Sequence, residues 1–378
     1  MLTVDGRVQI TRTRWHSPEE GSTSEIDGAL DLAEATVSVG VRELICRLNQ
    51  HAGSFAKTSE NLWRAAQIQA SAETIRQLVE QEGKAALRVE RRGQVPIGWE
   101  AKGCETPGGV TRVYLGSDGV KVPLVTDVEK KKRREKVRRK RRRRGPGRPL
   151  QARKRGADQP YKEFKLVAYY DESGDHTHVS VTKGDHRSAG RLMRRDACRI
   201  ALHEADQKVA NVDGADWIRN QIRLQSLPMD AVGLDFYHLA ENVHKARRAV
   251  FGEEAADGMA WAGEMLHVVK HQGYEAFWDR LTAWRGKVRG RAKRKAADRL
   301  LHYVAERRSM IAYPRFIDQG WQIGSGPTEA LCKTITSRLK GRGRRWDADN
   351  AEAVATLSAL EQSGQWELYW QTALQPTG

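Results

Sequence analysis

Three acidic residues stand where an α/β protein commonly places a site. Asp118 ends a predicted strand at 111–118, Asp213 follows a short predicted strand at 209–212, and Glu329 lies in the first turn of a predicted helix. Ligands of such folds bind at the carboxyl ends of sheet strands. Three carboxylates gathered there would repel and raise one another's pKa, and carboxylate oxygens are ligands that Mg²⁺ prefers. The pattern therefore indicates a candidate acidic site.

Each of these residues also has an ordinary structural explanation. Glycine follows both Asp118 and Asp213, as it does in many turns. A glutamate in the first turn of a helix, such as Glu329, stabilises the helix dipole. Asp171 is the main competitor for a catalytic role, because it ends the strongest predicted strand, 164–170.

Histidines and cysteines offer weaker candidates for a metal site. His176 and His178 share one face of a predicted hairpin strand and, with Asp175, could bind a metal, but a polar hairpin tip explains them better. The four cysteines are far apart and form no C-x-x-C pair, so neither a disulfide scaffold nor a zinc ribbon is expected.

The N-terminal region has helical periodicity from Val41 to about Leu87. We expect a second helix at 55–66 and a third that begins after an N-cap at Ser71 and ends at Gly83. Helix, tight turn and helix is the geometry of a helix-turn-helix, and a three-helix packing unit without DNA contact is the alternative. The third helix would expose polar side chains able to read base edges, namely Arg76, Gln77 and Gln81.

The middle of the chain alternates between strand and helix patterns. Strands are expected at 111–118, 164–170, 178–182, 209–212 and 229–234, with 120–125 continuing the first strand or turning back on it. Helices are expected at about 188–208, from Trp217, over 239–311, from Pro327 and at 349–362. This order predicts an α/β fold whose mixed sheet has helices on both faces, with an all-α insertion and an N-terminal helical domain.

The positive charge of the chain is concentrated in one segment. The net charge is +17, from 65 Lys and Arg against 48 Asp and Glu. Residues 128–155 carry 17 of the basic residues and only two Glu, so the remaining chain is close to neutral on average. Such an arm condenses onto polyanions and releases counterions, which favours nucleic acid as a partner over a solvated linker or a localisation signal.

The sequence resembles the DDE transposases of bacterial insertion sequences, in the Mutator-like group with an RNase H-like core. The resemblance covers about residues 40–370. It is carried by Tyr114-Leu115-Gly116-Ser117-Asp118-Gly119, by Asp213-Gly214-Ala215-Asp216-Trp217-Ile218, by Leu234-Asp235-Phe236-Tyr237-His238 and by the segment Gly320-Trp321-Gln322-Ile323-Gly324-Ser325-Gly326-Pro327-Thr328-Glu329-Ala330.

The resemblance implies roles for these residues. The catalytic, metal-binding triad would be Asp118, Asp213 and Glu329, and Asp235 with His238 would support the active site. The cofactor would be two Mg²⁺ ions, which Mn²⁺ can replace and which stabilise the attacking and leaving oxygens of a phosphodiester in an in-line displacement. Relatives often carry cysteine pairs near the N-terminus, where this chain has Trp15-His16-Ser17-Pro18-Glu19, so a metal-bound N-terminal module is not expected.

Two basic segments would bind DNA. Arg144-Gly145-Pro146-Gly147-Arg148-Pro149 is similar to an AT-hook, which places arginines in narrow A·T minor grooves, and a non-specific arm is the equal alternative. Phosphate clamping beside the active site is expected from Lys333, Arg338, Lys340, Arg342, Arg344 and Arg345. Trp346 would either stack on a displaced base or pack in the core.

The expected organisation follows from these assignments. The divisions are a poorly ordered lead at 1–38, a helical DNA-binding domain at 39–100, the first part of an RNase H-like core at 108–238 with the basic arm at 128–160, a helical insertion at 239–320, and the last part of the core with C-terminal helices at 321–378.

The expected function is transposition. The protein would bind the ends of its element, cleave a strand and join the freed 3′-hydroxyl to target DNA. The alternatives are a non-catalytic repressor or architectural protein derived from a transposase, and an RNase H-like nuclease without strand transfer. We expect a homo-oligomer, a dimer or larger. Because no window approaches the ~18 apolar residues of a membrane span and no signal peptide is evident, we expect a cytoplasmic, nucleoid-associated protein without a membrane segment.

Overall fold

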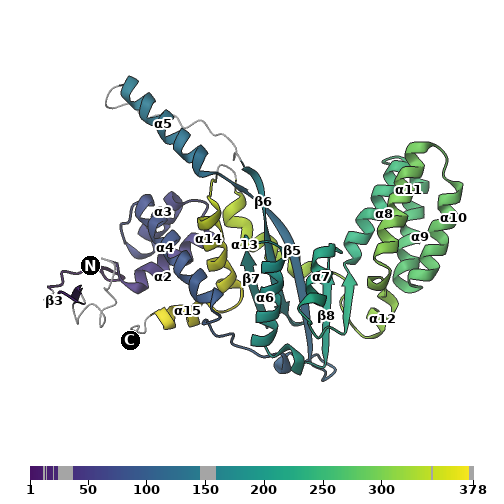
Figure 1. The fold of residues 1–378 in the computed structure, drawn as a ribbon, viewed down its shortest axis with the longest axis horizontal. Coiled ribbons are helices and arrows are strands. Elements are labelled where there is room, and N and C mark those ends of the chain that lie inside the picture. The colour runs from purple at the N-terminus through teal and green to yellow at the C-terminus, as the bar shows by residue number, and fades with distance from the viewer. Residues whose placement is uncertain are drawn as a thin grey trace.

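The computed structural model describes residues 1–11, 13, 15–19, 21–23, 37–144, 159–341 and 344–373. The described chain is elongated, with a group of helices at one end, a sheet in the middle and a second helical block at the other end (Figure 1). None of the described helices is both long and apolar enough to cross a membrane.

A five-stranded mixed sheet forms the centre, as the α/β prediction requires. Its strands are β5 (Arg112–Leu124), β6 (Gln159–Tyr170), β7 (Thr177–Thr182), β8 (Gln207–Val212) and β9 (Ala231–Leu234). Their order is β7-β6-β5-β8-β9. Strands β5, β6 and β7 are antiparallel neighbours, and β8 and β9 run parallel to β5.

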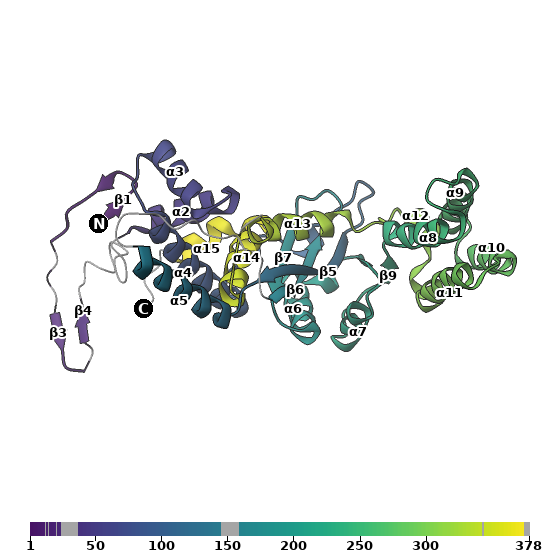
Figure 2. The same ribbon diagram turned by 90° about the horizontal axis from the view of Figure 1, so that it is seen from above.

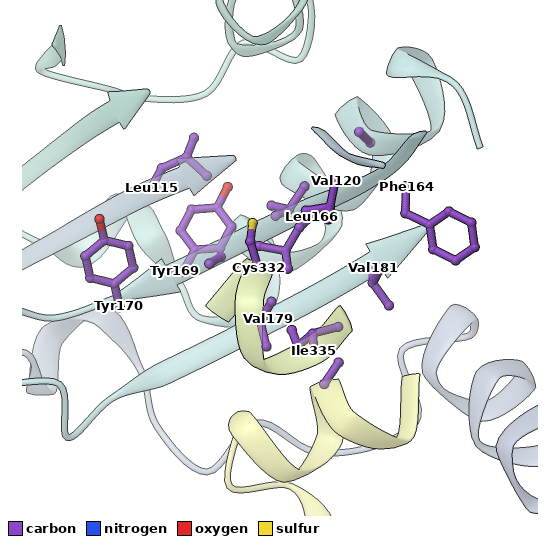
Figure 3. Close-up of a cluster of buried hydrophobic side chains, with 14 of the residues drawn as sticks. Leu115, Val120, Phe164, Leu166, Tyr169, Tyr170, Val179, Val181, Cys332 and Ile335 are labelled. Atoms are coloured by element: carbon purple, nitrogen blue, oxygen red, sulfur yellow. The ribbon is translucent and has the colours of Figure 1, made fainter. Parts of the chain in front are cut away.

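Helices cover both faces of this sheet (Figure 2). One face carries α13 (Gly326–Lys340) and α14 (Ala348–Gln362), followed by the short α15 (Trp366–Ala373), and the other carries α6 (His186–Arg199) and α7 (Asp216–Leu224). Figure 3 shows the core between α13 and the sheet, where Cys332 and Ile335 lie over side chains such as Leu166 and Val179. The central strands β5, β6 and β8 are rich in β-branched and aromatic residues that are buried on both faces of the sheet.

The N-terminal helices are α2 (Val39–His51), α3 (Phe55–Ala66) and α4 (Ala72–Arg91). A serine caps each of them, because the side chains of Ser38, Ser54 and Ser71 accept hydrogen bonds from the first turn. The predictions of a helix at 55–66 and of an N-cap at Ser71 are confirmed. Short antiparallel strands precede them, namely β1 (Leu2–Thr3), β2 (Gly6–Arg7), β3 (Trp15–Ser17) and β4 (Gly21–Thr23), and the rest of the predicted lead at 1–38 lies mostly outside the described residues.

The predicted helix end at Gly83 is wrong. Helix α4 continues to Arg91, and Gly83 is buried in its middle. A Cβ at Gly83 would lie 2.9 Å from the backbone of Ala353 in α14, so the glycine permits a close crossing of two helices. The residue therefore serves packing and not helix termination.

Two further boundaries differ from the predictions. Residues 112–124 form one strand, β5, so the alternative in which the second segment continues the first is the observed one. The helix expected at 188–208 ends at Arg199, because Ala201 adopts a left-handed conformation with φ 51°. A 3-10 turn at Leu202–Glu204 then leads into β8.

The basic arm begins as a helix. Helix α5 (Asp127–Arg144) follows β5 and projects away from the body (Figure 1). At the opposite end, the helical block contains α8 (Phe236–Phe251), α9 (Ala256–His271), α10 (Tyr274–Lys287), α11 (Arg291–Glu306) and α12 (Tyr313–Asp318). Short 3-10 turns complete the elements at Ala101–Gly103 and Arg308–Met310.

Candidate active site

Three aspartates lie on or directly after three neighbouring parallel strands. Asp213 and Asp235 follow β8 and β9, whereas Asp118, which was predicted to end a strand, lies inside β5. Leu115 of β5 pairs with Ala210 of β8, so Asp118 and Asp213 each lie three residues beyond paired positions. Val212 pairs with Leu234 in the same way, which places Asp235 level with Asp213. The sheet register thus brings together residues that are far apart in the chain.

The carboxylate of Asp118 is held at one oxygen and less constrained at the other. The backbone N–H of Gly119 donates to its Oδ1, while the thiol of Cys332 lies 3.7 Å from its Oδ2. Burial, together with the charge of Asp118, raises the pKa of the Cys332 thiol, so this group stays protonated. Asp118 itself is half-buried in β5 and faces helix α13.

Asp213 is a partly buried carboxylate with a like charge nearby. Burial raises its pKa above the ordinary value, the N–H of Ala215 opposes this by donating to Oδ1 at 2.8 Å, and the charge of Asp118 raises the pKa further. The guanidinium of Arg307, from the end of the helical block, donates to the carbonyl of Gly214 at 3.1 Å and holds the adjacent backbone. The charge of Asp118 therefore adds to the effect of burial on the pKa of Asp213.

Asp235 joins two segments that carry other candidate residues. It is buried and caps helix α8, where its Oδ1 accepts from the N–H of His238 at 2.9 Å. Its Oδ2 accepts from the N–H of Ser325, the residue that precedes α13. Both carboxylate oxygens are therefore used to tie the start of α8 to the start of α13.

Glu329 and His238 meet at this junction. The Nε2 of His238 lies 3.7 Å from Oε1 of Glu329, and the glutamate side chain is 59% exposed. Glu329 lies in the first turn of α13, where the helix dipole favours a negative charge. The structure therefore places Glu329 beside His238 and within reach of solvent.

The position of α13 depends on Gly116. A Cβ at Gly116 would lie 1.8 Å from Oγ1 and 3.0 Å from Cβ of Thr328, the residue before Glu329. The glycine in Tyr114-Leu115-Gly116-Ser117-Asp118 thus allows the helix that carries Glu329 to lie directly on the strand that carries Asp118.

A groove of about 630 Å³ lies between β5 and α13. Asp118 and Glu329 line it, together with the lysines Lys121, Lys333 and Lys340. Acidic groups that can hold cations and basic groups that can hold phosphates therefore share one open surface.

The carboxylate oxygens of Asp118, Asp213 and Glu329 do not all lie within 4.8 Å of one another. Among the described residues, the group of three potential ligands within 4.8 Å of one another is Cys104, Asp171 and His176. Asp171 there organises a turn, since it accepts hydrogen bonds from Ser173, from the N–H of Gly174 and from His176, whose Nδ1 is 2.7 Å away.

The two hairpin histidines have separate partners. His176 contacts Asp171, whereas the buried His178 has its Nε2 3.4 Å from the buried Asp196 of α6. Asp175 is exposed. The three residues therefore do not converge on one site. The interpretation as a polar hairpin tip is wrong for His178, which is buried inside β7.

Two of the predicted DNA-contacting residues are buried, which corrects that expectation. Arg338 is 3% exposed and its guanidinium lies over the rings of Phe55 and Trp346. Burial lowers the pKa of Arg338 to about 10. Trp346 is 4% exposed and packs edge-to-face with Phe55, so the alternative of core packing is the observed one. Both residues hold α3 against α13 and do not face solvent.

The remaining predicted contacts are distributed between surface and undescribed segments. Lys333 and Lys340 line the groove, and Arg344 and Arg345 are half-buried. Arg342 and Arg148 lie outside the described residues, and Arg144 is the last residue of α5. Arg76 forms ion pairs with Glu73 and Glu80, and the amide of Gln77 also donates to Glu73.

Three groove or site residues were not predicted from the sequence. Cys332 follows Glu329 at i+3, so a helical-face argument could have identified it. Lys121 stands alone as an exposed residue between buried valines of β5. Arg307 comes from the helical block, and nothing local in the sequence connects it with Asp213.

Comparison with known proteins does not extend this description. No protein-family model matches the chain, and no curated protein matches it either.

Proposed function

We propose that the chain is a DNA transposase of an insertion sequence, in which Asp118, Asp213 and Glu329 form a DDE triad on an RNase H-like core. It would bind the element ends, cleave a strand with the aid of two Mg²⁺ ions and transfer the 3′-hydroxyl to target DNA. The placement of Asp118 and Asp213 at equivalent positions of adjacent parallel strands, with Glu329 on the helix that covers them, is the observation that carries this proposal.

The topology supports the RNase H-like assignment. Three consecutive antiparallel strands are followed by two parallel strands that are reached through helices α6 and α7. A helical block then separates the last strand from α13. This is the arrangement that the resemblance to Mutator-like transposases implies, with the third acidic residue supplied after an all-α insertion.

The residues fit divalent cations. Asp118 and Asp213 each use one oxygen for a backbone N–H. The second oxygen of Asp118 accepts only the weak thiol donor of Cys332, which a cation can displace. The raised pKa of Asp213 reflects burial and repulsion that a cation would relieve. Glu329 is exposed and has a long side chain that can turn toward the aspartates. Carboxylate oxygens with retained water ligands are the usual coordination of Mg²⁺.

When bound, a pair of Mg²⁺ ions stabilises the attacking and leaving oxygens of a phosphodiester. The chain's own residues prepare that arrangement. Asp118 and Asp213 are held by the sheet, Asp235 fixes the start of α13, and His238 orients Glu329. Lys333 and Lys340 are placed to hold the phosphates of a strand in the groove.

The test is cleavage of a labelled duplex taken from the DNA that flanks the reading frame, with Mg²⁺ or Mn²⁺ supplied. The wild-type chain should cut one strand and join the end to a target duplex, whereas Asp118→Asn should bind the DNA and fail to cut. Cleavage without joined products would indicate a nuclease. Binding without any cleavage by the wild type would indicate a non-catalytic DNA-binding protein, and normal cutting by Asp118→Asn would exclude the proposed triad.

A further inference from the structure

The helical block carries a second concentration of positive charge. Eight basic residues occur between the end of α10 and the middle of α11, where Asp298 is the one acidic residue. We call residues 285–299 the α10–α11 corner. Its basic residues are Arg285, Lys287, Arg289, Arg291, Lys293, Arg294, Lys295 and Arg299. The near-neutral average of the chain outside the basic arm conceals this cluster.

Most of these charges are not neutralised locally. Asp298 is paired with Arg285, whose Nε lies 2.5 Å from Oδ1. The other seven cations of the corner are exposed and form no ion pair with any carboxylate that the structure describes, and Arg291, Lys293, Lys295 and Arg299 are the four of them that lie on α11 and make no hydrogen bond to a backbone carbonyl. Unpaired like charges this close together repel one another, so the cluster destabilises the isolated chain.

Elsewhere on the same block, four exposed cations have acidic partners. Lys245 pairs with Glu241 and Arg248 with Glu253. Two others pair across helices, Arg280 with Glu264 and Arg308 with Glu275. The α10–α11 corner therefore differs from the balanced surface around it, which is the pattern expected of a binding surface and not of a uniformly solvated face.

Three of the unpaired cations are arranged in a row beside a groove. Arg291, Lys295 and Arg299 are four residues apart, so they follow one face of α11 at intervals of about 6 Å. They line an open groove of about 770 Å³. One strand of a duplex has a phosphate every 3.4 Å along the axis, so a row of about 12 Å can follow three or four phosphates.

We propose that the α10–α11 corner binds the phosphate backbone of a DNA duplex, as a surface separate from the candidate active site and from helix α5. In both views α5 and the corner lie toward opposite ends of the long axis, with β5 and the start of α13 between them (Figures 1 and 2). A long duplex held at the active site would then have basic surfaces on either side. This inference rests on the proposed function, because it takes DNA as the substrate.

The test compares two variants that lose the same charge from the same block. The corner variant carries Arg291→Gln, Lys293→Gln, Lys295→Gln and Arg299→Gln. The control variant carries Lys245→Gln, Arg248→Gln, Arg280→Gln and Arg308→Gln, which removes four cations that have acidic partners. All eight residues lie on the surface, and circular dichroism checks that both variants are folded. Binding of a random-sequence duplex of about 60 base pairs is measured over a range of salt concentrations.

Each lost phosphate contact reduces the salt slope of log K by about 0.9, so loss of four contacts predicts a change of about 3.6 for the corner variant. The control variant should change the slope by less than half of that. Equal slopes for the two variants would overturn the inference while leaving the proposed function intact. A wild-type chain that binds no duplex would overturn both. If the corner variant instead loses binding to anionic lipid vesicles and keeps its duplex slope, the partner is a membrane surface and the inference is wrong.

Discussion

The Nε2 of His238 lies 3.7 Å from Oε1 of Glu329, although nearly all of the helical block separates the two residues in the chain. Asp235 creates this proximity, because its two oxygens accept from the N–H groups of His238 and Ser325. The start of α8 and the start of α13 are thus fixed to one carboxylate. We treat Asp235 and His238 as positioning residues, since in the proposed function Glu329 is the group that contacts the metal.

His238→Gln should lower Mg²⁺-dependent cleavage by about 10- to 100-fold, the usual effect of losing a partner of a metal ligand. The Mg²⁺ concentration needed for half-maximal cleavage should rise at the same time, because Glu329 loses its orientation. The measurement is a titration of Mg²⁺ at saturating DNA. A variant that lowers the rate equally at every Mg²⁺ concentration would mean that His238 does not act through Glu329.

Asp213→Asn should stabilise the metal-free protein at neutral pH. Burial and the charge of Asp118 raise the pKa of Asp213, so its contribution to stability is present at low pH and is lost as the pH rises through the raised value. The amide cannot ionise, and the gain in Tm should therefore shrink between pH 7 and about pH 4, near the ordinary Asp value. Mg²⁺ should raise the Tm of the wild type by mass action but not that of Asp213→Asn.

Asp171→Asn provides the opposite sign as a control. Burial alone would raise the pKa of Asp171, but hydrogen bonds from His176 and Ser173 lower that pKa below its ordinary value. Its contribution to stability is present at neutral pH and is lost as the pH falls through the lowered value. Asp171→Asn should therefore lower the Tm at pH 7 while keeping Mg²⁺-dependent cleavage. If Asp171→Asn fails to cleave while Asp118→Asn cleaves normally, the catalytic carboxylate belongs to β6 and not to β5.

Gly116→Ala should reduce both stability and cleavage. The new Cβ would overlap Thr328, so α13 must shift away from β5, and overpacking of this kind costs about 1–3 kcal/mol. Thr328→Ala added to it should restore part of the stability, because the remaining Cβ contact at 3.0 Å is milder. Gly263→Ala is the matched control, since nothing lies within 4 Å of its Cβ position in α9. Chemical denaturation of all four proteins gives the comparison.

Replacing residues 128–155 with a flexible linker should flatten the salt dependence of DNA binding sharply. This segment contains 17 Lys and Arg. Even six to ten phosphate contacts imply a loss of about 10³–10⁵ in affinity between 50 and 200 mM salt. An unchanged slope in the linker variant would assign that dependence to other parts of the chain.

Arg76 should change its partner on binding DNA. In the free protein its guanidinium is held by Glu73 and Glu80. If Arg76 reads a base, Arg76→Ala should weaken binding to the element end by about 1–3 kcal/mol and leave random DNA unaffected. Glu73→Gln with Glu80→Gln should tighten end binding, because the competing carboxylates are gone. No effect of either change would leave the three helices as a packing unit.

Local signals predicted the parts of the fold that depend on neighbouring residues. The N-cap at Ser71 and the helix at 55–66 follow from side-chain chemistry within one turn. The strand positions follow from β-branched residues and glycine turns, and they placed Asp213 and Asp235 at strand ends. The positions of Asp213 and Asp235 at strand ends and of Glu329 at the start of α13 were therefore predictable without knowledge of the pairing register, whereas Asp118 lies inside β5 and not at a strand end.

Contacts between distant segments were not predictable in the same way. Gly83 looks like a helix terminator, and only the approach of Ala353 explains its place inside α4. Arg338 looks like a surface group in a basic stretch, and the sequence left Trp346 undecided between base stacking and core packing, but Phe55 from another helix covers both residues. The helical state of α5 was missed because its charge dominated the interpretation, although Lys, Arg and Glu all have high helix propensity.

The crossing of α4 and α14 at Gly83 has a consequence for where the chain would cut. The end of α4 is also anchored to the body, since Glu90 accepts from Ser180 and pairs with Arg195, and Arg91 pairs with the buried Glu352. The N-terminal helices are therefore fixed by packing and ion pairs to the part of the chain that carries the aspartates. If those helices recognise the element end, the distance from the recognised sequence to the active site is fixed. The scissile phosphate then lies at a constant number of base pairs from that sequence. Moving that sequence along the DNA should move the cut by the same distance.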